Sequence, residues 1–195
     1  MTTPTSANDA RLVAPVDTLD HVRGPAFAPV TLIEYADFEC LHCGRVYGIL
    51  QRLTTSVPDT FRLVYRHFPL GWEHPHANDA ARAAEAAARQ GRFWEMHDML
   101  FRHQDALDRE ALRAYAEDLG LDLARFDADL ADQATLARVE RDVASGERSG
   151  VRGTPTFFLN GARYSDPWDL DVLRAAIARA ALDAPGARGS SNHAR

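Results

Sequence analysis

The two cysteines of this chain, Cys40 and Cys43, are the only ones among its 195 residues, and two residues separate them. Cysteines this close together cannot build the long-range disulfide framework of a small secreted domain, which needs several bridges. They also cannot supply a four-cysteine zinc site. The pair therefore indicates redox chemistry, part of a metal site, or inert core thiols.

The cysteine pair lies between a predicted strand and a predicted helix. Residues 30–36 form a short apolar, β-branched run that is typical of a buried strand, and residues 41–56 follow as a helix. Residues 61–68 alternate again and end before Pro69, which predicts a second strand. Strand, helix and strand in about 40 residues form a βαβ unit, which favours parallel strands and a right-handed crossover.

A long stretch of helical periodicity, residues 77–149, follows this unit. Its apolar residues recur at the i, i+3, i+4 spacing of amphipathic helices. The candidate N-cap residues are Asn78 or Asp79, Asp108 and Asp122. Glu85 and Arg89 are four residues apart in the order that favours an ion pair along one helix. The sequence therefore predicts several helices here.

The pattern changes again near the C-terminal end. Residues 156–159 and 162–164 form two predicted strands, and the Asn-Gly pair between them favours a type I′ hairpin turn. Asp166 and Pro167 are expected to cap a final helix. The predicted order is β-α-β, a helical block, and β-β-α.

The start of a helix is a favourable place for a reactive thiol. Its unpaired amide groups and its macrodipole stabilise a thiolate at Cys40, and a protonated His42 would lower the thiol pKa further. Cys43, one turn along, can reach the first sulfur and resolve a mixed disulfide. The alternative is a zinc site with histidines such as His74 and His76. We expect no metal, because the spacing supports only the cysteine half.

Two further positions bear on the chemistry. Alternation places Glu34 on the same strand face as Leu32 and Ala36. The residues leave two alternatives open: a buried carboxylate with a raised pKa that carries protons, or one that reaches the sheet edge and water. Pro155 follows Thr154, and composition alone favours an ordinary trans bond. A cis bond there would expose the preceding backbone for pairing with an extended peptide.

Charge and composition exclude several classes of protein. The net charge is −6, and the arginines are scattered among 28 acidic residues, which argues against nucleic-acid binding. No run approaches the roughly 20 apolar residues of a membrane span. The polar residues 1–11 carry no signal-peptide pattern, so we expect a cytoplasmic protein without membrane insertion. Residues 1–11 and 183–195 are predicted to be disordered tails, and no nucleotide-binding motif indicates a cofactor.

Two segments carry a resemblance to a known family. Residues 34–43, Glu-Tyr-Ala-Asp-Phe-Glu-Cys-Leu-His-Cys, and residues 150–161, Gly-Val-Arg-Gly-Thr-Pro-Thr-Phe-Phe-Leu-Asn-Gly, resemble the DsbA-like branch of the thioredoxin superfamily. Residues 66–70, 74–77 and 91–98 also look like the bacterial members of that branch. The resemblance runs from about residue 21 to residue 182.

The resemblance implies an α/β thioredoxin-like fold with βαβ and ββα halves and an all-helical insertion. The thioredoxin-like domain would comprise residues 12–74 and 150–182, and the insertion residues 75–149. The implied activity is thiol–disulfide exchange with protein or peptide substrates, without a cofactor, and with an unknown redox partner that recycles the cysteine pair.

The resemblance also assigns roles to single residues. Cys40 would be the exposed nucleophile and Cys43 the resolving thiol. Glu34 matches the acidic position on the strand before the active site. His42 matches the histidine of the Cys-Pro-His-Cys motif, but Leu41 stands where the strongly oxidising members have proline.

The peptide-binding face would comprise Leu41, Thr154 and Pro155, with a cis bond between the last two. A peptide-binding or chaperone module with little redox turnover, and a metal-binding protein that uses the same cysteines, are alternative functions. The remaining histidines and tryptophans are expected to pack in the core or line a groove; they include His67, His97, Trp72 and Trp94.

Overall fold

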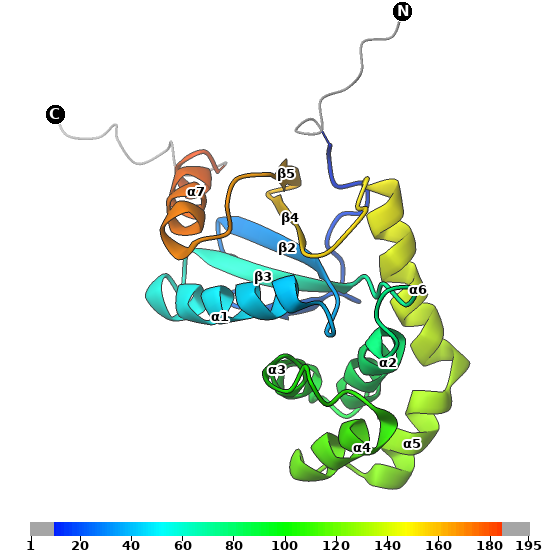
Figure 1. Ribbon diagram of the computed structural model, residues 1–195. Helices are drawn as coiled ribbons and strands as arrows, with labels where there is room; N and C mark the ends of the chain where they lie inside the picture. Colours follow the sequence, from blue (N-terminus) through cyan, green and yellow to red (C-terminus); the bar gives the residue numbers. More distant parts are fainter. Residues whose placement is uncertain (1–9, 185–195) are drawn as a thin grey trace, which may run out of the picture.

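The structure is a computed structural model, and it describes residues 10–184 (Figure 1). Most of the two predicted tails lies outside the described residues. The end of the predicted N-terminal tail is ordered, however. Arg11 forms an isolated antiparallel bridge with Ala162, and the amide of Arg163 donates to the carbonyl of Ala10 at 3.1 Å. Residues 10 and 11, at the end of the predicted tail, are therefore ordered.

The described residues form a five-stranded mixed sheet in the order β1-β3-β2-β4-β5 (Figure 1). The strands are β1 (His21–Arg23), β2 (Val30–Ala36), β3 (Phe61–His67), β4 (Thr156–Leu159) and β5 (Ala162–Tyr164). β2 and β3 pair in parallel through the connecting helix α1 (Leu41–Ser56), which confirms the predicted βαβ unit. The remaining neighbours pair antiparallel. The cysteine pair thus follows the central strand of the sheet.

Short elements show where local patterns succeed and fail. The hairpin between β4 and β5 has positive φ at both turn residues, 47° at Asn160 and 79° at Gly161, as predicted for a type I′ turn. β1 has only three residues, which is too short for an alternation signal, and the sequence did not predict it. It is recognised only through its pairing with β3, in which His21 lies opposite Tyr65.

Six helices of the described chain follow α1. They are α2 (Ala77–Ala88), α3 (Phe93–Arg102), α4 (Arg109–Asp118), α5 (Leu123–Ala131), α6 (Gln133–Arg148) and α7 (Leu170–Leu182). α2 to α6 lie between β3 and β4, in the stretch where the insertion is predicted. α2 to α5 gather beside the end of the sheet, and α6 returns along its side (Figure 1).

The two faces of the sheet are covered by different helices. On one face, Leu53 of α1 and Leu173 of α7 pack in one cluster with Leu32 of β2. On the other face, Ile33 belongs to a cluster against which Val143 of α6 packs. Burying each such side chain contributes about 1.5–3 kcal/mol. Because side chains alternate along a strand, Glu34 points to the same side as Leu32, toward α1.

The cysteines belong to the core of the helical block rather than to either cluster of the sheet. Phe38, Cys40 and Cys43 form one buried cluster with side chains from α2 to α5, such as Met96 and Leu100. The candidate site therefore lies where the sheet and the helical block meet.

The helix caps correct part of the sequence analysis. Asp108 and Asp122 accept hydrogen bonds from amides three residues on, at 3.0 Å each, as predicted. Asn78 and Asp79 are not caps, because α2 already begins at Ala77.

The predicted cap of the last helix is also wrong. Asp169, rather than Asp166 with Pro167, accepts the amide of Val172 at 3.1 Å, and α7 begins at the next residue. Both aspartates fit the local pattern, and the second one is the N-cap.

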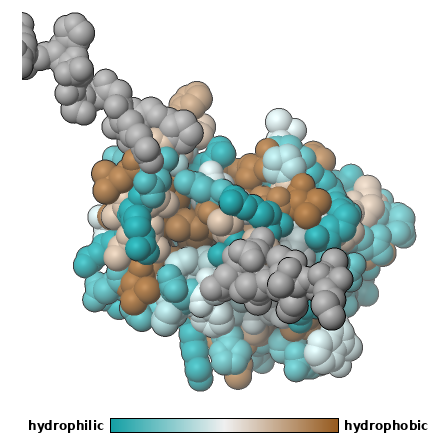
Figure 2. Space-filling model, turned by 90° about the horizontal axis from the view of Figure 1, so that it is seen from above, coloured by the Kyte–Doolittle hydropathy of each residue, from teal (hydrophilic) through white to brown (hydrophobic). Residues whose placement is uncertain are grey.

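The surface seen from above in Figure 2 carries separate hydrophobic patches among hydrophilic side chains. None of the helices in the described part of the chain is both long and apolar enough to cross a membrane.

Candidate active site

The cysteine pair opens α1 in a nearly closed environment. Cys40 is the N-cap residue, with extended backbone angles, and Cys43 lies within the first turn. Both are free thiols. The side chain of Cys40 is 5% exposed and that of Cys43 is fully buried. The implied exposed nucleophile is therefore the more accessible of the two, but most of its surface is covered.

The two thiols differ sharply in acidity. A hydrogen bond from the Cys43 thiol, with further ones from Thr154 and the backbone amides of Cys43 and His42, lowers the pKa of Cys40 to about 5, although burial opposes this. Burial raises the pKa of Cys43 well above its ordinary value. Near neutral pH, Cys40 is therefore a thiolate and Cys43 a thiol. The helix amides act as the sequence predicts.

Glu34 is the buried acid of the site. Its side chain is 2% exposed, which decides between the two alternatives left by the sequence in favour of burial. Burial and the negative charge of Cys40 raise the pKa of Glu34 to about 8. The charge of Glu34 in turn contributes to the raised pKa of Cys43. A carboxyl that titrates near neutral pH beside the more basic thiol is suited to accept its proton.

His42 and Leu41 lie on the outer side of the helix start. Leu41 is 70% exposed, and His42 is exposed too. The backbone amide of His42 stabilises the Cys40 thiolate. Among the contacts of the described residues, none joins the imidazole to the sulfur, so its predicted part in lowering the thiol pKa stays a prediction.

The loop between α6 and β4 lies opposite the cysteines. The Thr154–Pro155 peptide bond is cis, the conformation that the resemblance implies. The sulfur of Cys40 lies 3.4 Å from the carbonyl oxygen of Thr154, and Pro155 is buried. Beside Pro155 is an open surface hollow of about 580 Å³. Its lining comprises Pro155, Thr156, Phe157, Arg163, Tyr164, Ser165, Asp166, Pro167 and Trp168.

Asp37 holds the segment that carries Cys40, and the sequence analysis did not single it out. Its carboxylate accepts the amides of Glu39 and Leu70, both at 2.8 Å, and bonds His74 Nδ1 at 2.7 Å. Although burial opposes it, the bond to Asp37 and the charge of Cys40 raise the pKa of His74. The signal for this role was present, because Asp37 lies inside the resembling segment.

Gln104 fixes the same segment from the helical block. Its side-chain amide donates to the carbonyls of Phe38, at 2.6 Å, and Cys40, at 2.9 Å. No local pattern distinguishes this glutamine from a surface residue, so sequence reasoning had no means of finding it.

Two tryptophans and two histidines were expected to pack in the core or line a groove. Trp72 is 79% exposed, so a core position is wrong for it, whereas Trp94 is half-buried and donates from Nε1 to the carbonyl of Val22 at 3.2 Å. His67 and His97 are buried, in agreement with the expected packing roles.

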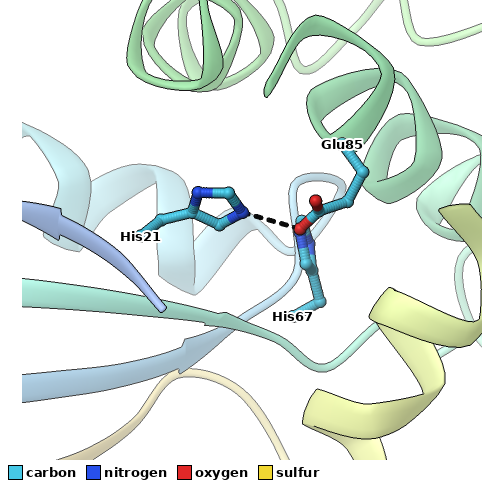
Figure 3. Close-up of side chains that lie close together, drawn as sticks. All are labelled: His21, His67 and Glu85. Carbon is cyan, nitrogen blue, oxygen red and sulfur yellow. Dashed lines mark hydrogen bonds and ion pairs between the residues drawn. The ribbon is translucent and has the colours of Figure 1, made fainter. Parts of the chain in front are cut away.

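Among the described residues, the cluster with metal-ligating geometry is His21, His67 and Glu85, whose ligand atoms lie within 4.8 Å of one another (Figure 3). The cysteine pair and His74 with His76 do not form such a group. Glu85 Oε1 lies 2.7 Å from His21 Nε2 and 2.9 Å from His67 Nε2. The ion pair predicted between Glu85 and Arg89 is therefore not made.

Hydrogen bonding explains this cluster better than a metal does. The guanidinium of Arg138 lies 3.8 Å from the same oxygen of Glu85, where it competes with a cation. The Nδ1 atom of His67 is buried without a partner among the described residues, whereas a metal-bound imidazole normally bonds through its second nitrogen. Although burial opposes it, the two imidazoles hold the pKa of Glu85 well below its ordinary value. The cluster therefore ties α2 to β1 and β3.

A sheet with this strand order, entered by a Cys-x-x-Cys helix and faced by a cis proline, defines the thioredoxin-like class of proteins. A family profile described as Thioredoxin matches residues 17–179, so the chain belongs to the thioredoxin family. Solved structures of DsbA proteins share its fold, which is the fold that the resemblance implies.

Three solved structures illustrate this likeness. A thioredoxin-like oxidoreductase from Silicibacter pomeroyi DSS-3 is 29% identical, with a TM-score of 0.76 over 84% of this chain and 93% of that one. BdbD from Bacillus subtilis is 21% identical, with a TM-score of 0.78 over 89% and 99% of the two chains. The α-DsbA1 protein of Wolbachia pipientis is 20% identical, with a TM-score of 0.77 over 88% and 95%. The last two show the fold alone.

Curated relatives with higher identity have a different kind of name. The Na⁺/H⁺ antiporter NhaA 3 of Salinispora tropica is 51% identical over 167 residues, which are 85% of this chain and 26% of that protein. The NhaA antiporter of Herminiimonas arsenicoxydans is 48% identical over 167 residues, 85% and 26% of the two chains. This chain spans about a quarter of the length of these relatives.

Proposed function

We propose that this protein is a thiol–disulfide oxidoreductase that exchanges disulfides with protein or peptide substrates through Cys40 and Cys43. The observation that carries the proposal is the opposite acidity of the two thiols: the pKa of Cys40 is about 5, and that of Cys43 is well above its ordinary value. One thiol is thus ready to react near neutral pH, and the other holds its proton until it is needed.

The reaction follows from this asymmetry. In one direction, the Cys40 thiolate attacks a substrate disulfide, one substrate sulfur leaves as a thiolate, and a mixed disulfide remains. In the mixed disulfide Cys40 no longer carries the negative charge that helps to raise the pKa of Glu34, so Glu34 gives up its proton more readily. As a carboxylate it then takes the proton of Cys43, and the new thiolate attacks the Cys40 sulfur and releases the second substrate thiolate.

In the other direction, a substrate thiolate attacks the Cys40 sulfur and forms a mixed disulfide, and Cys43 leaves as a thiolate that recovers a proton from Glu34. A second substrate thiolate then attacks the substrate sulfur and releases the Cys40 thiolate.

The surface around Cys40 supports an extended peptide as substrate. The carbonyl of Thr154 lies against the sulfur, and the hollow beside Pro155 has room for a side chain of the substrate. Leu41, which follows Cys40 directly and is 70% exposed, offers a further apolar contact. We assign substrate binding to these three residues.

The direction of electron flow follows from the same thiolate. A stabilised Cys40 thiolate favours the reduced pair and hence an oxidising potential. We therefore propose an oxidant or isomerase. The cytoplasmic location and the redox partner that recycles the pair stay predictions, as does the chaperone alternative.

Catalysed reduction of insulin disulfides tests the proposal directly. We expect activity from the wild type, none from Cys40→Ser, and a trapped mixed disulfide with substrate from Cys43→Ser, because only the resolving thiol is then missing. Equal rates for the wild type and Cys40→Ser would reject the proposal. Client aggregation suppressed equally well by both proteins would instead favour the chaperone function.

A further inference from the structure

A small cavity lies beside Glu34, between α1, the sheet and α3. Its volume is about 10 Å³, close to the least that holds one water molecule. Its lining comprises Arg23, Glu34, Tyr47, Leu50, Gln51, Thr54, Leu63 and His97. No side-chain hydrogen bond of Glu34 is found among the described residues, and this cavity lies against its side chain.

His97 lines the same cavity with one ring nitrogen unused. Its side chain is nearly buried, and Nδ1 lies 2.9 Å from Oδ1 of Asp98. The carboxylate of Asp98 favours the tautomer that carries its proton on Nδ1. Nε2 then has a free lone pair, and it is buried without a partner in the described part of the chain. A buried acceptor of this kind calls for a donor such as a water molecule.

Asp98 continues this line of polar groups to the surface. Arg23 donates to both of its oxygens, at 3.0 and 2.9 Å, and Gln51 donates at 3.2 Å. The side chains of Arg23 and Asp98 are 25% and 19% exposed. Asp98, which touches solvent, is therefore one hydrogen bond from His97, which lines the cavity together with Glu34.

Three other side chains line the cavity but are less suited to pass a proton. Arg23 and Gln51 donate to Asp98, and the hydroxyl of Thr54 donates to the carbonyl of Gln51 at 2.8 Å. On α1 Glu34 also faces the two cysteines and Tyr47, and on β3 the buried Tyr65. The phenols hold their protons, since burial raises the pKa of Tyr47 and Tyr65.

We propose that His97 and one water in this cavity carry protons between Glu34 and solvent, with Asp98 as the outer carrier. This inference rests on the proposed function, because it concerns the acid that serves Cys43. On the outward path, Glu34 protonates the water, the water protonates Nε2, and Nδ1 passes its proton to Asp98, which releases it.

The opposite half-reaction resets the ring. When Glu34 has given its proton to Cys43, Asp98 takes a proton from solvent and returns one to Nδ1. The proton on Nε2 then moves through the water to Glu34, so the ring regains its first tautomer. His97 touches neither substrate nor sulfur, and it acts as a positioning and proton-carrying residue.

The test is the rate of disulfide formation and opening in the His97→Phe variant, which keeps the aromatic packing and removes both nitrogens. The partner is oxidised or reduced glutathione, followed by stopped flow from pH 6 to 9 in H₂O and D₂O. We expect the rate of Cys43 attack to fall by about tenfold or more near pH 7. This is less than the roughly hundredfold effect of an acid or base at the reacting atoms, because His97 acts through Glu34. The equilibrium constant against glutathione should stay within about twofold, since a carrier changes rates only.

Two further variants separate the relay from structure. His97→Gln keeps a hydrogen-bonding side chain but cannot pass a proton, so it should show the same loss of rate. His103→Phe alters an exposed histidine at the end of α3 and should behave as the wild type. Unchanged rates in both His97 variants, or a loss matched by the equilibrium constant, would overturn the relay. Insulin turnover by the wild type, measured in parallel, reports on the proposed function independently, because glutathione reacts with the pair even without a protein substrate.

Discussion

Replacing Glu34 by glutamine should stabilise the reduced protein, although the glutamate belongs to the proposed active site. The folded pKa of this carboxyl is about 8, against an ordinary value of 4.5. Between these values the unfolded chain ionises while the folded chain keeps the proton, so stability falls as pH rises. At pH 7 the interval is about 2.5 pH units, which at about 1.36 kcal/mol for each unit amounts to about 3 kcal/mol.

The Glu34→Gln variant lacks this ionisation and should recover that free energy. We expect its free energy of unfolding to exceed that of the wild type by about 3 kcal/mol at pH 7, and the gain to vanish below pH 4.5. Urea denaturation of the reduced proteins from pH 4 to pH 8 measures the difference at each pH. The same variant should resolve mixed disulfides more slowly, because Cys43 has lost its proton acceptor.

Glu95→Gln is the matched control. Glu95 is largely exposed, and its hydrogen bond from Arg92 lowers its pKa, so this variant should lose rather than gain stability above pH 4.5. A difference between wild type and Glu34→Gln that stays constant from pH 5 to pH 8 would refute the reasoning. So would a Glu34→Gln variant less stable than the wild type at pH 8.

Two other outcomes follow from the site. The ultraviolet absorbance of the Cys40 thiolate should titrate with a midpoint near pH 5 and be absent in Cys40→Ser; a midpoint at the ordinary 9.0 would contradict the hydrogen bonds described. Because the folded pKa is the lower one, this thiolate stabilises the protein fully above pH 9 and not below pH 5. Glu85→Ala should destabilise the fold by about 3 kcal/mol, since hydrogen bonds from His21 and His67 to a charged group are lost, whereas the exposed Glu110→Ala should cost under about 0.5 kcal/mol in urea denaturation. Equal losses in the two variants would show that the cluster does not hold α2 to β1 and β3.

The elements nearest the site could be predicted because their signals are local. Residues 30–36 and 61–67 are strands whose pattern is carried by neighbouring residues, and the alternation also placed Glu34 on the correct side. The cysteine pair correctly marked the start of α1. These features need no knowledge of what packs against them.

Other features depend on partners that are distant in sequence. The roles of Asp37 and Gln104 arise only when the loop after β2 meets the segment after β3 and the end of α3. The cluster at Glu85 combines three elements, and local spacing suggested Arg89 instead. The depth at which Glu34 lies is likewise set by the helices around it.

The shared core of the cysteines and the helical block couples two quantities that are usually measured separately. Reduction and unfolding form a thermodynamic cycle, so whatever stabilises the reduced fold over the oxidised one raises the reduction potential by the same free energy. For a two-electron couple, about 1.4 kcal/mol corresponds to about 30 mV. A substitution at Phe38 or Met96, which pack in the cluster that includes Cys40 and Cys43, can thus make the pair more or less oxidising. The helical block is in this sense a tuning element, through which the potential can change while the Cys-x-x-Cys sequence stays the same.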